Sequence, residues 1–136
     1  MNRVFLLATC LLLLAAQTPD TRLSGMWHYG IDRNQEYMVR ITHSGQHVRA
    51  EYLIRDPASG AEHVYAVARG VKRSFWDCYL EGEYIASCRH VAKGTRFREL
   101  WLIYDNENRI QTLSYWGVHR IKHYLVREGS PDTTEP

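Results

Sequence analysis

The sequence lacks the short motifs that identify many enzyme classes. It contains no G-x-S-x-G nucleophile elbow, no glycine-rich phosphate loop and no H-E-x-x-H zinc motif. It also lacks an excess of charge, since 17 lysines and arginines face 15 aspartates and glutamates. Nucleic-acid-binding proteins usually gather basic residues on one face, whereas here the two signs alternate along the chain. We therefore expect no nucleic-acid partner, and no reaction is specified by a motif.

Long hydrophobic runs are also missing, apart from one near the N-terminus. Residues 4–14 carry no charge, follow a basic residue and precede small residues. About 20 apolar residues are needed to cross a bilayer, so this run is too short for a membrane span. Its pattern predicts a cleavable secretory signal over residues 1–17 and export to the periplasm or the extracellular space. A lipid anchor at Cys10 is the alternative, because residues 7–10 are similar to a lipobox.

Cysteine is scarce, with three residues in the chain. Cys10 lies in the expected signal, which leaves Cys78 and Cys88 in a protein bound for an oxidising compartment. A hairpin turn at residues 81–84 would place these two directly opposite each other, close enough for a bridge. We therefore expect a Cys78–Cys88 disulfide, which would stabilise the fold by roughly 2–3 kcal/mol. A nucleophilic Cys88, with His90 two residues later, is the alternative.

Alternation of apolar and polar residues dominates the rest of the chain. Val48, Ala50, Tyr52 and Ile54, for example, alternate with charged or polar residues, a period typical of half-buried strands. Turn-forming residues separate such runs, and no helical period is long enough to interleave with them. The expected strands cover residues 25–31, 36–43, 46–55, 61–69, 73–80, 84–92, 96–104, 109–116 and 118–127.

This pattern predicts an all-β fold, a small up-and-down antiparallel β-barrel of about 8–9 strands. Closing the sheet removes the exposed edges that invite aggregation, and about eight strands enclose room for side chains or one small ligand. A two-sheet sandwich is the alternative. We expect the barrel domain over residues 24–128, after a disordered segment at 18–23 and before a flexible tail at 129–136.

Aromatic residues are the main candidates for a binding site. The chain has four tryptophans and nine tyrosines, which combine a broad contact area with a polar tip. We expect Trp27, Tyr52, Trp101 and Trp116 to line or cover a ligand site, although such residues suit a packed core equally well.

Histidines and carboxylates supply the remaining chemical candidates. His119 and His123 would lie about 13 Å apart in a strand, too far to share one zinc ion. We therefore expect neither a metal nor a cofactor. Asp77 and Glu99 each share a strand face with large apolar residues, so either could point inward and act as a general base.

A short motif stands at the start of the first expected strand, where Gly25, Met26 and Trp27 form G-x-W. This motif in a small exported barrel resembles lipocalins, and also the avidin group. In lipocalins the tryptophan closes one end of the barrel and a late arginine packs across it. The resemblance gives Trp27 the first role and Arg120 or Arg127 the second, and it implies a barrel that binds a ligand.

Three functions are compatible with these observations. The first is an exported, non-enzymatic binding protein that holds a small, partly apolar molecule. The second is a periplasmic or secreted protein inhibitor, or an immunity protein, against a cell-wall-degrading enzyme. Rigid polar loops at residues 56–60 and 105–109 and an apolar face at Leu100 and Leu102 would serve it. The third is an enzyme that uses the inward carboxylate.

Overall fold

The computed structural model describes residues 18, 20–32, 34–72, 77–88, 90–116 and 119–130, which form eight β-strands. The expected signal at 1–17 and the tail residues 131–136 lie outside this part of the chain. Seven of the expected strands match observed ones, whereas those at 73–80 and 84–92 are replaced by a single strand, β5. The strands are β1 (Gly25–Asp32), β2 (Gln35–Ser44), β3 (His47–Arg55), β4 (Glu62–Lys72), β5 (Asp77–Tyr84), β6 (Arg96–Asn106), β7 (Arg109–Trp116) and β8 (His119–Arg127).

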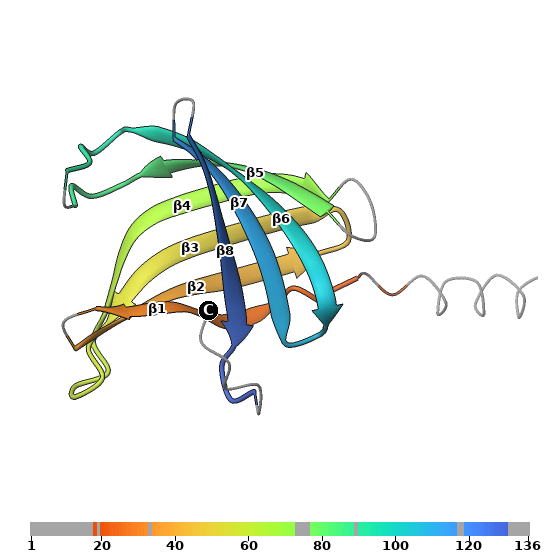
Figure 1. Ribbon diagram of the computed structural model, residues 1–136, viewed down its shortest axis with the longest axis horizontal. Coiled ribbons are helices and arrows are strands. Elements are labelled where there is room, and N and C mark those ends of the chain that lie inside the picture. The colour runs from red at the N-terminus through yellow and green to blue at the C-terminus, as the bar shows by residue number, and fades with distance from the viewer. Residues whose placement is uncertain are drawn as a thin grey trace, which may run out of the picture.

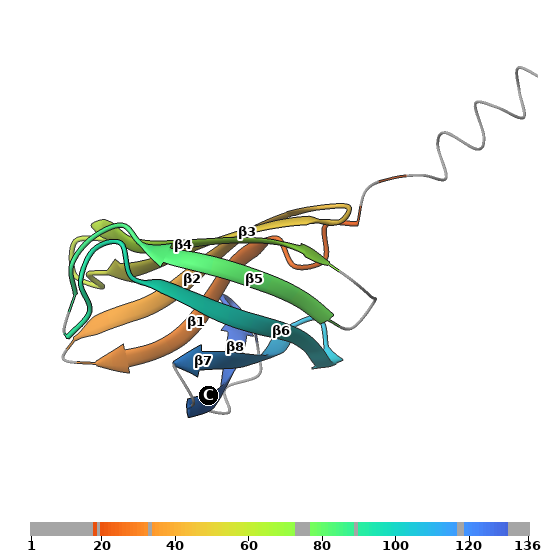
Figure 2. The same ribbon diagram turned by 90° about the horizontal axis from the view of Figure 1, so that it is seen from above.

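The strands form one closed antiparallel barrel. Each strand pairs with the next along the chain, and β8 returns to β1 (Figures 1 and 2). The contact between β1 and β8 that closes the barrel is short and comprises two residue pairs, Trp27 with Arg127 and His28 with Val126. The structure therefore confirms the predicted all-β, up-and-down barrel rather than the two-sheet sandwich.

Alternate residues of the strands face the barrel interior, as the period of two predicts. Ile41, Ala50 and Ala68 are neighbours across β2, β3 and β4, and each is 2% exposed or less. Their sequence neighbours Arg40 and Arg49 point outward and form ion pairs on the surface. The core comprises Leu23, Trp27, Val39, Ile41, Val48, Ala50, Tyr52, Ala66, Ala68, Cys78, Leu80, Tyr84, Phe97, Ile110 and Leu125.

Two fully buried apolar residues, Met38 and Leu53, lie on the outer face instead. They are direct partners on β2 and β3, one position out of phase with the inward residues. The next outward pair of residues is the Glu36–Arg55 ion pair, at 2.8 Å. Long charged side chains can cover apolar surface while their charges stay in water, and an ion pair beside these two residues is suited to that role.

The expected turn at residues 81–84 is instead the last part of β5, and the chain turns at residues 85–95. Gly82 is a packing position, because a Cβ atom there would lie 2.2 Å from Cζ of Phe97 on β6. A glycine inside a strand often marks such a close approach. The sequence therefore needs glycine at this point for the aromatic ring, and the chain does not reverse there.

The predicted disulfide depended on that turn and is not formed. Cys78 is 1% exposed and is the strand partner of Trp101 on β6. Cys88 lies in the 85–95 connection, where its backbone forms an isolated β-bridge with that of Val91. The two cysteines are therefore not opposed. Burial raises the pKa of the Cys88 thiol, which disfavours the thiolate that a nucleophile requires.

The two ends of the barrel differ in what they connect. We call the end where β1 begins and β8 finishes the closed end (Figure 1). The opposite end, the far end, carries the β3–β4 connection at residues 56–61 and the β5–β6 connection at residues 85–95.

Gly70→Ala tests the close approach of β5 to β4. A Cβ atom at Gly70 would lie 1.8 Å from the carbonyl oxygen of Tyr79, a backbone atom that cannot rotate away. We expect this substitution to lower the free energy of unfolding by about 2 kcal/mol, as overpacking does. Gly30→Ala is the control, because nothing lies within 4 Å of its Cβ position. Urea denaturation followed by circular dichroism compares the two, and equal stability would contradict the described packing.

Candidate functional site

Trp27 plugs the closed end of the barrel and is 1% exposed. The guanidinium carbon of Arg127 lies 4.2 Å from the centroid of its ring, a cation–π arrangement. Nη1 and Nη2 of Arg127 donate hydrogen bonds of 2.8 Å to the carbonyl oxygens of Ser24 and Arg22. Its Nε donates to a carbonyl oxygen in the β6–β7 turn at 3.1 Å. Of Arg120 and Arg127, which the resemblance left open, the structure places Arg127 across the tryptophan.

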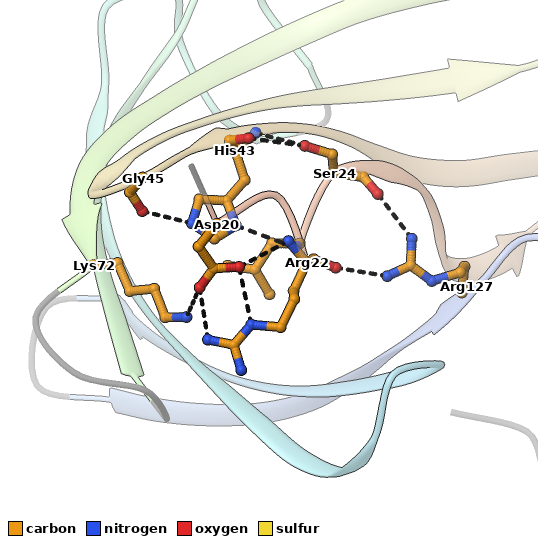
Figure 3. A network of polar contacts seen from close by, with 8 residues as sticks. Asp20, Arg22, Ser24, His43, Gly45, Lys72 and Arg127 are labelled. Atoms are coloured by element: carbon orange, nitrogen blue, oxygen red, sulfur yellow. Dashed lines mark hydrogen bonds and ion pairs between the residues drawn. The ribbon is translucent and has the colours of Figure 1, made fainter. Parts of the chain in front are cut away.

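The N-terminal segment that was expected to be disordered is held against this end from residue 20 onward (Figure 3). Leu23 is 3% exposed, and its carbonyl oxygen accepts a hydrogen bond of 2.9 Å from Nε1 of Trp27. The carboxylate of Asp20 accepts hydrogen bonds from Arg22 and, at 2.8 Å, from Nζ of Lys72. These hydrogen bonds, above all that from Arg22, hold the pKa of Asp20 well below its usual range. The Asp20 carboxylate therefore supplies a counter-charge to the Lys72 ammonium, whose side chain is only 7% exposed.

His43 fixes the same segment from β2 and is 2% exposed. Its Nδ1 accepts a hydrogen bond of 3.2 Å from the N–H of Leu23, so its proton lies on Nε2, 2.8 Å from the carbonyl oxygen of Gly45. Ser24 exchanges two more hydrogen bonds with the His43 backbone. A connected polar network thus holds the N-terminal segment across this end of the barrel.

Aromatic rings line the half of the interior that lies toward the far end. The ring centroids of Tyr52 and Phe97 are 5.5 Å apart, and those of Tyr84 and Phe97 are 5.3 Å apart. Tyr65 stacks on Tyr84 at 6.2 Å. Such separations are typical of stabilising aromatic pairs. Burial raises the pKa of both Tyr65 and Tyr84, so this wall presents apolar faces together with neutral hydroxyl groups.

Two polar residues are buried in the same interior. Glu99 is 2% exposed and Thr112 is 0% exposed. Burial, and then the charge of Glu99, raise the pKa of Tyr29 to about 12. The Tyr29 ring lies 5.0 Å from that of His123, whose pKa is lowered by burial, so the imidazole is neutral at neutral pH. Within the described residues, the hydroxyl oxygen of Thr112 has no hydrogen-bond partner.

The four residues predicted to line or cover a ligand site do not share one place. Trp27 seals the closed end, whereas Tyr52 is 7% exposed in the wall toward the far end. Trp101 lies in β6 and Trp116 ends β7, and the side chains of both are outside the described part. Of these four, Tyr52 and Trp27 thus face the barrel interior, in different parts of it.

Of the two carboxylates named from the sequence, Glu99 is inside the barrel, and the side chain of Asp77 lies outside the described part. Glu99 has a second titratable group, Tyr29, close enough to respond to its charge. Sequence reasoning missed Thr112, and it considered His123 as a metal ligand only. The alternation in the strand expected at 109–116 could have predicted that Thr112 faces inward, because it follows the inward Ile110 by two residues.

The described residues show no metal centre, because no three His, Cys, Asp or Glu side chains among them lie close enough to hold an ion. His119 and His123 are four residues apart on the single strand β8. Nor does this part of the chain contain a helix long and apolar enough to cross a membrane.

Asp20→Asn tests the seal at the closed end. Because the folded-state pKa of Asp20 is depressed, its carboxylate contributes stability that is present at neutral pH and is lost as the pH falls below about 4. We expect the variant to lose about 2 kcal/mol at neutral pH, the scale of a hydrogen bond to a charged group, and to show a flatter decline in acid. Urea denaturation from about pH 7 to pH 2 measures both effects. Glu83→Gln is the control. If the stability of Asp20→Asn falls in acid as steeply as that of the wild type, the proposed role of Asp20 is wrong.

Comparison with known proteins gives no relative. Neither a protein-family model, nor a curated protein, nor a solved structure matches this chain. The closed eight-strand barrel is compatible with a calycin-like architecture, and its function has to be argued from its own residues.

Proposed function

We propose that the protein is a non-enzymatic binding protein that holds a small, partly apolar molecule inside the barrel. The observation that carries the proposal is Thr112, which is fully buried and whose hydroxyl lacks a hydrogen-bond partner within the described residues. An unsatisfied buried hydroxyl costs about 1–3 kcal/mol, and folded proteins rarely retain one without a reason. A bound molecule would have to displace the side chains that now enclose this hydroxyl, and a hydrogen bond with Thr112 would then recover this free energy.

The buried residues of the barrel interior indicate what such a molecule would contain. The rings of Tyr52, Tyr84 and Phe97 offer apolar contact, so the ligand would combine an apolar or aromatic body with one hydrogen-bonding group. The pairing of Trp27 with Arg127 supports a lipocalin-like plan, in which one end is closed and the ligand enters at the other. In this proposal the protein acts after export, in the periplasm or outside the cell, as the pattern in residues 1–17 predicts.

Thr112→Val separates a binding role from a structural one. The substitution keeps the shape of the side chain and removes the hydroxyl, so we expect the unliganded variant to be as stable as the wild type or more stable. We expect the fluorescent probe N-phenylnaphthylamine, an aromatic amine, to bind the wild type saturably and the variant about tenfold more weakly. Ile110→Val, which shortens an inward neighbour on the same strand, is the control and should keep the affinity. Equal affinity of wild type and Thr112→Val, or no saturable binding, would contradict the proposal.

The inhibitor alternative is favoured by one observation, the rigidity of the exposed β3–β4 loop. The carboxylate of Asp56 accepts hydrogen bonds of 3.0 Å from Ala58 N–H and from the Ser59 hydroxyl. The Asp56 backbone closes the loop through hydrogen bonds with Gly60 and Ala61, at 2.8 and 2.9 Å. A preordered loop loses little entropy when it binds a protein, which suits an inhibitor.

Asp56→Ala distinguishes this alternative from the ligand carrier. If the loop inhibits a wall-degrading enzyme, the wild type will slow the hydrolysis of bacterial cell walls by a muramidase, and the variant will do so about tenfold less effectively. Its binding of N-phenylnaphthylamine should not change. A ligand carrier leaves the hydrolysis rate unaffected in both forms, and turbidity of a cell-wall suspension reports that rate.

A further inference from the structure

A groove of about 370 Å³ lies on the outer face of the barrel, where β3, β4, β5 and β6 run side by side (Figure 2). Its side chains alternate with buried ones such as Ala50, Ala68 and Leu80, and they therefore point away from the interior. The residues that line the groove are Arg49, Val67, Arg69, Glu81, Gly82, Glu83, Ile85 and Arg96. The groove is thus separated from the interior site by the sheet itself.

Two arginines occupy directly opposed positions in this groove. Arg49 on β3 is the partner of Arg69 on β4. Like charges in such positions destabilise a sheet, and Glu81 on β5, the partner of Arg69 on its other side, offsets part of this cost. Arg49 forms an ion pair with Glu51. Arg69 forms no ion pair and no side-chain hydrogen bond with any residue that the structure describes.

The opposite wall of the groove carries a third arginine. Arg96 on β6 is the direct partner of Glu83 on β5, yet within the described chain Arg96 also forms no ion pair and no side-chain hydrogen bond. Glu81 lies 3.8 Å from Arg98, which partly offsets its charge. Val67 and the 44% exposed Ile85 add apolar surface beside these groups. Two guanidinium groups, from Arg69 and Arg96, therefore remain available to a ligand.

We propose that this groove binds the oxyanion group, a carboxylate or a phosphate, of a small ligand, between Arg69 and Arg96. The planar guanidinium presents two parallel N–H donors that match the two oxygens of such a group. The volume falls in the range of small-ligand sites. Glu81 and Glu83 on β5 are the direct partners of Arg69 and Arg96, and both limit the affinity because their carboxylates repel the bound oxyanion. The site is independent of the function proposed for the interior.

Calorimetric titration with citrate and, separately, with pyrophosphate tests the proposal, and the two experiments distinguish the carboxylate from the phosphate. We expect at least one anion to bind the wild type saturably at low ionic strength. The double variant Arg69→Gln, Arg96→Gln should bind it about tenfold more weakly or worse, and Glu83→Gln should bind it more tightly. Affinity should fall as sodium chloride is added, because exposed charges are screened.

Lys93→Gln is the matched control, since Lys93 is exposed and lies outside the groove. It should bind the anion as the wild type does, and all variants should bind N-phenylnaphthylamine unchanged. The proposal is overturned if neither anion binds, if Lys93→Gln loses as much affinity as the double variant, or if Glu83→Gln binds more weakly. The proposal predicts that Glu83→Gln binds the anion more tightly. A misfolded variant would lose affinity, so misfolding cannot produce this result.

Discussion

The contact between β1 and β8 is the constraint on which the barrel depends, and its backbone part is small. Two residue pairs form it, one of them Trp27 with Arg127. The Arg127 side chain adds three hydrogen bonds to carbonyl oxygens of the N-terminal segment and the β6–β7 turn, and it stacks on the Trp27 ring. Lys72 on β4 and His43 on β2 then hold the N-terminal segment, through Asp20 and the N–H of Leu23. Closure, which removes the exposed edges of the sheet, therefore depends on side chains at one end as well as on the strand ladder.

The period of two in the sequence was sufficient to predict most strands and the all-β barrel. Each strand has one face toward solvent and one toward the interior, so polar and apolar residues alternate along it. It failed at residues 81–92, where Gly82 was interpreted as part of a turn. A glycine that lets the Phe97 ring approach the backbone and a glycine that permits a reversal are indistinguishable in one sequence. The cysteine prediction depended on the same interpretation. Met38 and Leu53 show a related limit, since nothing in their position in the sequence marks outward-facing residues as buried.

The interior site was only partly predictable for the same kind of reason. Alternation indicated that Tyr52 and Glu99 could face inward, and the G-x-W motif gave Trp27 its place. The choice of Arg127 required knowledge of which late residue meets the first strand, a contact between positions one hundred residues apart. The hydroxyl of Thr112 became notable only when its surroundings were known, because exposure and lack of a partner are properties of the fold. The order of residues 20–23 likewise depends on Lys72 and His43, which are distant in the sequence.

The alternation that closes the barrel also gives its two faces opposite chemistry. Across β3 and β4, Ala50 and Ala68 face inward where Arg49 and Arg69 face outward, one residue away in the chain. The interior holds the buried carboxyl group of Glu99 close to Tyr29, and an oxyanion that entered it would lose its hydration. The outer groove supplies guanidinium groups and remains in contact with solvent, where an oxyanion keeps part of its water. The two proposals therefore assign a neutral, partly apolar molecule and an anionic one to different faces of the same strands, where they would not compete for one site.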